Sequence, residues 1–355
     1  DIEMSFGDED TIFAVVEDLM QNIFKETKNY TLEDHFVRIP WAECMRRFGS
    51  DKPDMRFGNE IQDITSVFAN TEFQVFKNTI ENGGVVNCVK FENAADKYSR
   101  KGLDQLQDFV KHGFKAKALA YLKMENDVLT GSIAKVLSEE EKTKLVEKLG
   151  LANNDLVLVI ADNARIAQAS LGALRVRLGH ELNLIPAEAT YKFLWVTDFP
   201  MFEYSEEDQR WVAAHHPFTA PKEEDVDKLF TDPGHVSSRA YDLVLNGYEL
   251  LSGSIRIHSQ DLQAKVFEAI GLSLEDAKAR FGFFLDSFRY GTPPHGGVGI
   301  GLERLIMVLA GTDNIRDVVA FPTTNSSFDL MSEAPNVVDK KQLDILGIEI
   351  SKQEK

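Results

Sequence analysis

The stretch Gly296-Gly297-Val298-Gly299-Ile300-Gly301-Leu302-Glu303-Arg304 is the most informative in the chain. Alternate glycines on a strand leave one face without side chains, so a backbone or a flat ligand can approach closely. The residues that follow predict a helix over 302–309 with Arg304 in its first turn, where a cation opposes the helix dipole unless an anion joins it. We therefore expect a glycine strand leading into a helix that meets a nucleotide phosphate. Close glycine packing, with Arg304 bridging to a carboxylate, is the alternative.

The patterns on either side of this stretch predict an α+β fold. An alternating strand at residues 1–6 precedes an amphipathic helix that Asp10 could cap. After residue 193, strands separated by long connections and helices suggest an antiparallel or mixed sheet packed on helices. The further strands are expected at 193–202, 248–251, 254–258 and 318–321, and the helices at 261–270 and 274–284.

The middle of the chain alternates strand and helix patterns after a turn-rich boundary at 49–54. Strands are expected at 85–91 and 156–160, and helices at 103–112, closed by Gly113, and at 164–178. Ser138 with Glu141 forms the capping box of another helix that should stop at Gly150. This α+β module contains no cluster of catalytic residue types, so we expect it to make contacts.

The composition further limits the possible domain organisation, partners and cellular compartment. The 355 residues suit two domains, or one domain with a large insertion. No apolar run approaches the ~20 residues of a membrane helix, so we expect no membrane partner. Two cysteines, Cys44 and Cys88, cannot build a disulfide framework or a zinc site, which favours a reducing cytoplasm.

The net charge of −18 argues against a uniformly basic nucleic-acid binder, but the charge is unevenly distributed. Residues 54–190 are almost neutral, with 17 basic and 19 acidic groups. Within them, residues 90–123 carry eight basic side chains against four acids. This stretch could face a phosphate backbone, or it could be a solvated helix surface.

Three local patterns could carry chemistry. Asp242 and Glu249 lie on either side of an Asn-Gly turn, so a hairpin could bring two carboxylates together for Mg²⁺ bound with nucleotide phosphates, or leave them in a solvated turn. Arg256 alternates with apolar residues on a strand, where its guanidinium could grip a carboxylate or form a structural ion pair. His215 and His216 lack partners at zinc-ligand spacing, so anion binding or a surface turn fits them better than zinc.

Taken in order, these segments resemble the bacterial-type aspartyl-tRNA synthetases, a family of class II aminoacyl-tRNA synthetases. Gly-Leu-Glu-Arg at 301–304 resembles the family's motif 3, and residues 1–6 resemble the second strand of motif 2. The resemblance implies the class II antiparallel sheet flanked by helices, incomplete here, with an inserted α+β domain. It divides the chain into a first catalytic part at 1–53, an insertion at 54–187 and a second catalytic part at 188–355. The most specific segments are 193–202, 215–221, 240–258 and 290–321.

The resemblance also implies roles for single residues. Arg256 would bind the side-chain carboxylate of L-aspartate, Asp1 would contact its ammonium group with Glu3 nearby, and the two histidines would close over it. No residue would transfer a proton; Arg256 and Arg304 would act by positioning. The residues implied for ATP are Glu249, Gly301, Leu302, Glu303 and Arg304, with Asp242 and Glu249 on the Mg²⁺ that accompanies ATP.

The insertion would meet the aspartate-accepting tRNA, and the enzyme would be a cytoplasmic homodimer in its full-length form. The anticodon-binding barrel, the dimer helix of motif 1 and the first part of motif 2 are expected to precede Asp1. We therefore expect this chain alone to be inactive or nearly so. The stretch Leu251-Ser252-Gly253-Ser254 replaces a run of three glycines and a serine, and Glu303 stands where many members have Asp.

Two other functions stay open on these residues. Asparaginyl and lysyl synthetases are close relatives, although Arg256 and the His-His-Pro segment favour aspartate. A non-catalytic tRNA-binding or amidotransferase-associated paralogue would share the fold, although the presence of Asp242, Glu249, Arg256 and Arg304 argues for the enzyme.

Overall fold

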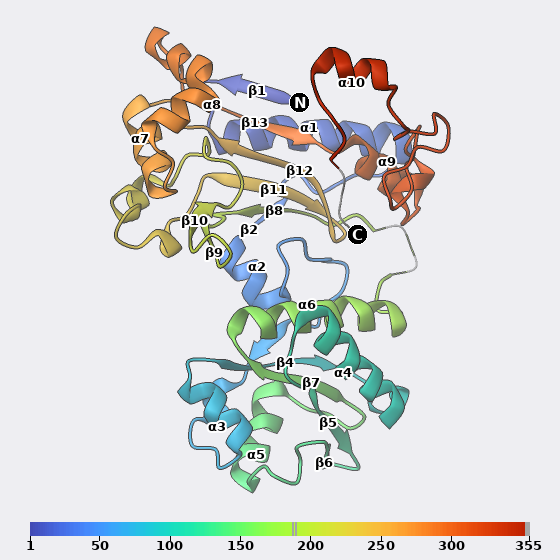
Figure 1. The fold of residues 1–355 in the computed structure, drawn as a ribbon. Helices are drawn as coiled ribbons and strands as arrows, with labels where there is room; N and C mark the ends of the chain where they lie inside the picture. The colour runs from blue at the N-terminus through green and yellow to red at the C-terminus, as the bar shows by residue number, and fades with distance from the viewer. Residues whose placement is uncertain (187, 189, 352–355) are drawn as a thin grey trace. The chain divides into compact units, whose positions relative to one another are not determined.

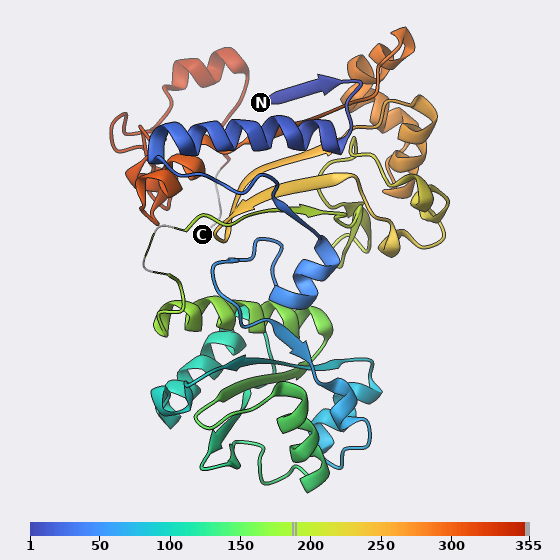
Figure 2. The same cartoon turned by 180° about the vertical axis from the view of Figure 1, so that it is seen from behind.

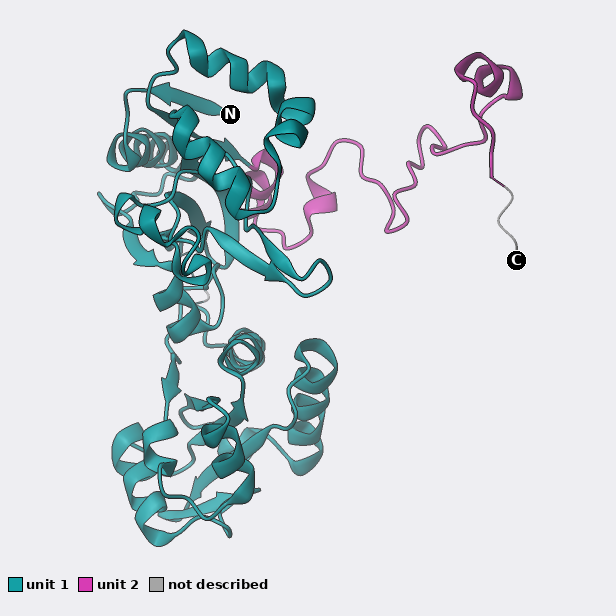
Figure 3. Ribbon diagram, turned by 60° about the vertical axis from the view of Figure 1, so that its left-hand side comes forward, with its two compact units in different colours: residues 1–300 teal, residues 301–355 magenta. Residues whose placement is uncertain are grey.

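The computed structural model of the chain describes residues 1–186, 188 and 190–351. Two units, residues 1–300 and residues 301–355, are each described by themselves (Figure 3). The division after residue 300 falls within the expected part 188–355, and residue 187, the expected end of the insertion, lies outside the described residues.

Strands from the first 40 residues and from residues 193–300 form a six-stranded sheet with helices beside it (Figure 1). Every neighbouring pair is antiparallel except β2 with β8, which is parallel. The α+β class, with a mostly antiparallel sheet flanked by helices, is confirmed. In spatial order the strands are β1 (Ile2–Ser5), β13 (His295–Ile300), β12 (Tyr248–Ile255), β11 (Ala240–Leu245), β8 (Phe193–Thr197) and β2 (Val37–Pro40).

Helix α1 (Glu9–Lys28) lies along one face of this sheet (Figure 2). Phe13 is 99% buried and stacks on Trp195 of β8, with 4.0 Å between ring centroids, and it meets Tyr241 of β11 edge to face. On the other face, Cys44 and Phe48 of α2 (Trp41–Phe48) pack in one cluster with alternate residues of β8 and β11. Alternation along the strands thus supplies each face with its own partner helix.

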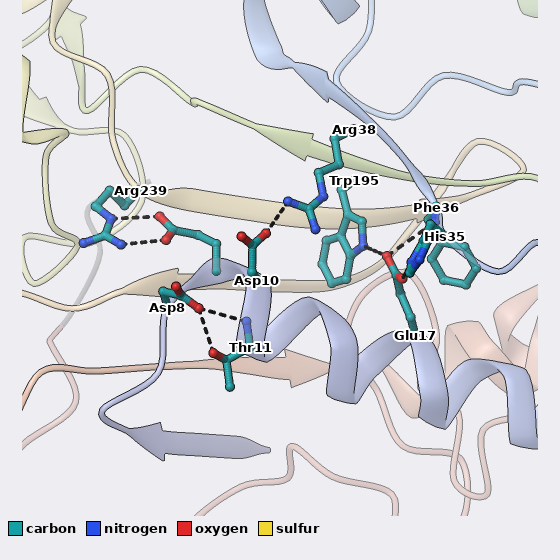
Figure 4. Close-up of polar contacts among 10 residues, drawn as sticks. Asp8, Asp10, Thr11, Glu17, His35, Phe36, Arg38, Trp195 and Arg239 are labelled. Atoms are coloured by element: carbon teal, nitrogen blue, oxygen red, sulfur yellow. Dashed lines mark hydrogen bonds and ion pairs between the residues drawn. The ribbon is translucent and has the colours of Figure 1, made fainter.

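The N-cap of the first helix lies two residues before the expected one. Asp8 accepts a hydrogen bond from Thr11 N at 3.0 Å and is the N-cap, whereas Asp10 lies inside the first turn and pairs with Arg38 (Figure 4). Further along α1, buried Glu17 accepts from Trp195 Nε1 at 2.9 Å. The prediction of Asp10 as the cap was wrong because a cap needs extended backbone, which Asp8 has.

A five-stranded antiparallel sheet occupies the middle of the chain, with helices on both faces (Figure 1). Alternate strand residues feed two cores, one with α4 and α6 and the other with α3 and α5. The strands are β3 (Ile61–Asp63), β4 (Val85–Phe91), β7 (Leu156–Asp162), β5 (Ala120–Glu125) and β6 (Val128–Gly131). The helices are α3 (Gln74–Glu81), α4 (Arg100–Phe114), α5 (Glu139–Leu149) and α6 (Ala164–Glu181).

Local signals in this region predict some helix and strand boundaries and not others. The strand at 85–91 and the capping box of Ser138 with Glu141 are confirmed, as is Gly150 in the left-handed region at φ 55°. Gly113, however, lies inside α4, and Lys115 is the left-handed C-cap at φ 62°. Helical hydrogen bonds on either side of Gly113 outweigh its low helix propensity.

A close joint connects α2 to α6. A Cβ at Gly49 would lie 2.0 Å from Gln168 O, and one at Gly172 would lie 2.5 Å from Phe48 O, so both positions require glycine. Fully buried Arg175 of α6 donates to the carbonyls of Asp54, Phe57 and Gly58 at 2.7–3.0 Å. The linker that leaves α2 is therefore held by α6 itself.

The remaining helices and strands come after β8 in the chain. Separately, none of the described helices is long and apolar enough to cross a bilayer. The strand expected at 318–321 is absent from the described residues, which form turns there, because that segment has no strand partner. The elements are β9 (Phe202–Ser205), β10 (Arg210–Ala213), α7 (Gln260–Ala269), α8 (Leu274–Ser287), α9 (Leu302–Ala310) and α10 (Lys340–Leu346).

Candidate active site

The face of the six-stranded sheet opposite α1 collects small and acidic side chains. Glu3 is paired with Gly297, and Gly297 with Ser254, while Ser252 is paired with both Gly299 and Asp242. Directly paired residues point to the same side of an antiparallel sheet. The register therefore places both carboxylates on one face, among residues with almost no side chain.

The glycines of β12 and β13 divide between the two faces. A Cβ at Gly253 would lie 2.1 Å from Gly297 O and 2.6 Å from the Tyr241 ring, and one at Gly296 would meet Ile12 of α1 at 3.1 Å. By contrast, a Cβ at Gly299 would meet only Asp1 Oδ1, at 3.1 Å. Close glycine packing therefore applies to Gly253 and Gly296, on the helix side, whereas Gly299 leaves space on the opposite face. The expected approach of a nucleotide to these glycines stays a prediction.

Arg256 follows β12 and is the centre of a polar cluster on that face. Its Nη1 donates to Ser254 Oγ and to His216 Nε2, both at 2.6 Å, and its Nη2 donates to Glu3 Oε1 at 3.1 Å. A cavity of 420 Å³ beside it is lined by Glu3, His216, Phe218, Arg256, Phe284 and His295. A guanidinium facing such a cavity can receive a carboxylate in exchange for one of its present partners.

His216 is held in its neutral form. Burial, with the nearby Arg256 and His215, lowers the pKa of His216 to about 4. The guanidinium of Arg256 has only donors, so Nε2 of the imidazole must accept from it. A neutral His216 therefore orients Arg256 without competing for an anion.

Asp242 of β11 is buried beside Ser252 of β12, and the structure gives one of its oxygens, Oδ1, no hydrogen-bond partner. Burial raises the pKa of Asp242 to about 7; the Ser252 hydroxyl opposes this, and the charges of Glu249 and Asp51 add to it. Two mutually repelling carboxylates with an orphaned oxygen fit a divalent cation that brings most of its other ligands with it. The described residues contain no group of three or more His, Cys, Asp or Glu side chains that could hold a metal ion by themselves.

The remaining predicted residues fall in two places. The His215 ring meets Phe199 edge to face at 5.2 Å, and burial lowers the pKa of His215 although Glu203, Glu249 and Asp51 oppose the shift. Asp1 lies at the edge of the open face, beside Gly299. Gly301, Leu302, Glu303 and Arg304 belong to the second unit, where Gly301 is the N-cap of α9 and the other three form its first turn.

Sequence reasoning missed several residues of the cavity. Phe218 and Phe284 form aromatic contacts with each other at 4.8 Å beside Arg256, and His295 accepts from Arg256 N through its carbonyl at 3.0 Å. Asp51 was passed over as part of a turn, yet its charge acts on both Asp242 and His215. They come from loops, from α8 and from β13, so only the tertiary fold brings them to the site.

The basic stretch at 90–123 proves to be heterogeneous. Lys123 donates to Ala95 O at 2.6 Å and to Tyr98 O at 2.8 Å, and Lys90 bonds Gly150 O at 3.4 Å, so both stabilise the fold. Arg100, Lys101 and Lys111 lie exposed on α4. Fewer cations are therefore exposed than the eight basic side chains counted in this stretch of the sequence.

Comparisons with known proteins agree with the motifs. The family model described as tRNA synthetases class II (D, K and N) matches residues 1–325. An aspartate–tRNA ligase of Staphylococcus carnosus is 47% identical over 350 residues, covering 99% of this chain and 59% of that protein. An aspartate–tRNA ligase of Listeria welshimeri is 49% identical, covering 100% and 60%.

A third relative, an aspartate–tRNA(Asp/Asn) ligase of Anoxybacillus flavithermus, is 47% identical over 355 residues, covering 100% of this chain and 60% of that protein. The chain thus spans about three-fifths of the length of these relatives. The resemblance inferred from the motifs is confirmed: the chain belongs to the family of class II tRNA synthetases (D, K and N).

Proposed function

We propose that the protein is an aspartate–tRNA ligase, which activates L-aspartate with ATP and transfers it to the 3′ end of tRNA in the cytoplasm. The observation that carries the proposal is the Arg256 guanidinium, which faces a cavity and is held by Ser254 and neutral His216. A planar cation of this kind selects a carboxylate over an amide or an ammonium group. The ligase names of relatives at 47–49% identity support the same substrate.

The amino acid would bind across the open face of the sheet. The side-chain carboxylate of the aspartate would replace Glu3 as the partner of Arg256. Glu3, released in this way, would bind the ammonium group of the aspartate together with Asp1. His215 and His216 would cover the bound amino acid. The α-carboxylate oxygen then attacks the α-phosphorus of ATP, pyrophosphate leaves, and a ribose hydroxyl of tRNA later attacks the acyl carbon with release of AMP. These steps need orientation and charge neutralisation more than a strong base.

ATP would bind next to the amino acid, with Glu249, Gly301, Leu302, Glu303 and Arg304 as its protein contacts. Asp242 and Glu249 would hold the Mg²⁺ that enters with the nucleotide, since magnesium usually takes only one or two carboxylates from the protein. The bound ion would supply neutralisation of phosphate charge. The unpartnered oxygen of Asp242 supports this assignment.

The domain division 1–53, 54–187 and 188–355 belongs to the same proposal, with the middle part as an insertion that contacts tRNA. The cations exposed on α4 support it. Replacing Lys97, Arg100, Lys111 and Lys115 by glutamine should weaken tRNA binding and flatten its dependence on salt, because fewer counterions are released. In the full-length protein the enzyme would be a homodimer.

The test is aspartate-dependent exchange of pyrophosphate into ATP, measured on this chain and on a chain extended to the full length of its relatives. We expect exchange with aspartate in the extended chain and little or none in this chain alone. Exchange that depends on asparagine or lysine instead would overturn the substrate assignment. No exchange with any amino acid, together with retained tRNA binding, would indicate a non-catalytic paralogue.

A further inference from the structure

A second cavity, of 550 Å³, lies where three segments of residues 1–300 meet. One wall is the linker after α2, which contributes Lys52, Asp54 and Arg56. Another is the pair α4 and α6, with Phe109 and Arg177, and the third is the turn between β11 and β12, with Tyr248. The proposed aspartate, ATP and magnesium contacts do not include these six residues.

The lining of this junction cavity is richer in cationic side chains than the chain as a whole. Its lining has three side chains that are always cationic, Lys52, Arg56 and Arg177, and a single carboxylate, Asp54, in a protein of net charge −18. That carboxylate is already engaged, because Arg56 grips it through Nε and Nη2 at 2.9 and 2.6 Å. Lys52 and Arg177 have Asp51 and Glu181 beside them, at 3.6 and 2.7 Å, and these two carboxylates do not line the cavity. Lys52 and Arg177 are therefore the cations that can meet an anion in the cavity.

Two of the cations keep donors for a ligand. The amino group of Lys52 lies 3.6 Å from Asp51, beyond a close hydrogen bond, and its side chain is 50% exposed. Arg177 uses Nε for Glu181, at 2.7 Å, a bond that leaves its Nη groups uninvolved. A phosphate group binds to such donors in several geometries.

Aromatic rings complete the cavity. Phe109 and Tyr248 both line it, and the Arg177 guanidinium lies over the Phe109 ring, 5.0 Å from its centroid. Cations along a groove combined with rings on which a base can stack are the features that bind single-stranded nucleic acids. A phosphate alone would leave the rings unused.

The walls are fixed before any ligand binds. The Asn246 side chain donates to Thr190 O at 2.8 Å and accepts from Lys192 N at 2.9 Å, which anchors the turn that carries Tyr248. Arg175 holds the linker through three carbonyls, including that of Asp54. Preorganisation of this kind lowers the entropic cost of binding.

We propose that the junction cavity binds one nucleotide, with its phosphate on Lys52 and Arg177 and its base against Tyr248 and Phe109. The nucleotide can be free or part of a single-stranded RNA. The RNA source rests on the proposed function, since an enzyme that charges tRNA meets unpaired nucleotides at the tRNA end; nucleotide binding itself does not rest on it.

The experiment is a titration of this chain with AMP, followed by the NMR signals of the Phe109 and Tyr248 rings, assigned with Phe109→Leu and Tyr248→Leu. We expect both rings to shift, and the double variant Lys52→Gln/Arg177→Gln to bind AMP at least tenfold more weakly at these rings. The matched control, Lys135→Gln/Lys144→Gln, loses two exposed lysines elsewhere and should bind like the unmodified chain. Unchanged ring signals, or equal affinities for both double variants, would overturn the proposal.

Further ligands separate phosphate from base and one source from the other. If inorganic phosphate binds at these rings as tightly as AMP does, the base makes no stacking contact, and the proposal is overturned. A tetranucleotide RNA that displaces AMP at tenfold lower concentration supports RNA as the source, and weaker displacement supports a free nucleotide. Absence of aspartate-dependent pyrophosphate exchange in the length-extended chain, with these ring shifts intact, would refute the proposed function alone.

Discussion

The two faces of the six-stranded sheet are made from the same strands, yet they differ in almost every physical property. The α1 face is filled by Phe13, Trp195 and Tyr241, all at most 1% exposed. The opposite face, around Arg256, has serine, glycine and acidic side chains beside a cavity. The packed face stabilises the fold, and the open face has the space and charge to bind a ligand.

The glycines show what this difference teaches. Gly253 and Gly299 occupy neighbouring strands, and the first faces the packed side while the second faces the open side. Substitution should therefore damage folding in one case and binding in the other. A glycine-rich segment has no single role; the side of the sheet to which each position points decides it.

The largest effect is expected from charge reversal on the open face. Arg256→Glu would place a carboxylate beside Glu3, remove the only cation in the cavity lining as the structure describes it, and repel aspartate. The bound aspartate would lose the cation that pairs with its side-chain carboxylate, and the loss of one partner of such a buried charged pair costs about 2–5 kcal/mol. The value of kcat/KM for aspartate-dependent exchange in the length-extended chain should therefore fall by more than roughly 30-fold. Arg165→Glu, an exposed arginine on α6, is the matched control. Aspartate activity that survives in Arg256→Glu would contradict the site.

The second prediction compares glycines across the two faces. In Gly253→Ala the new methyl group would lie 2.1 Å from Gly297 O, so the strands must separate and the free energy of unfolding should fall by about 1–3 kcal/mol. In Gly299→Ala it meets only the end of the Asp1 side chain, and stability should change by less than ~0.5 kcal/mol. Urea denaturation of both variants measures this. Equal losses would show that the two faces are packed alike.

A third prediction concerns the polar contact within the packed face. Glu17→Ala leaves Trp195 Nε1 and Phe36 N without their acceptor in a buried position, which should lower the free energy of unfolding by about 1–3 kcal/mol. Glu26→Ala on the exposed side of the same helix should have almost no effect. If both variants unfold at the same urea concentration, the buried carboxylate of Glu17 contributes nothing.

The smallest effect is a pH dependence on the open face. Because the pKa of His216 is lowered from 6.5 to about 4, the unfolded chain binds a proton between these pH values that the folded chain does not. The stability contributed by His216 is complete above pH 6.5 and is lost as the pH falls towards 4. His216→Gln keeps an acceptor for Arg256 but cannot titrate, so its free energy of unfolding should fall less between pH 7 and pH 4.5. An identical fall in both proteins would show that His216 does not contribute.

Much of the fold could be predicted because it rests on local periodicity. The strand at 85–91, the capping box at Ser138 and the class of the sheet all follow from neighbours in the chain. The errors arose where two local choices compete: Asp8 displaced Asp10 as a cap, and α4 continued through Gly113. The strand at 318–321 failed because a strand exists only with a partner, which no local pattern supplies.

The site was predictable in its residue types and not in its arrangement. The sequence by itself determined which groups can carry charge, where glycines replace side chains and which family's motifs they form. The tertiary structure alone decided that Glu3 and His216, 253 and 40 residues away from Arg256, meet its guanidinium, and which glycines lie on the open face. The reason is the strand register: residues distant in sequence set it, and a slip by one position would turn every side chain of a strand to the other face.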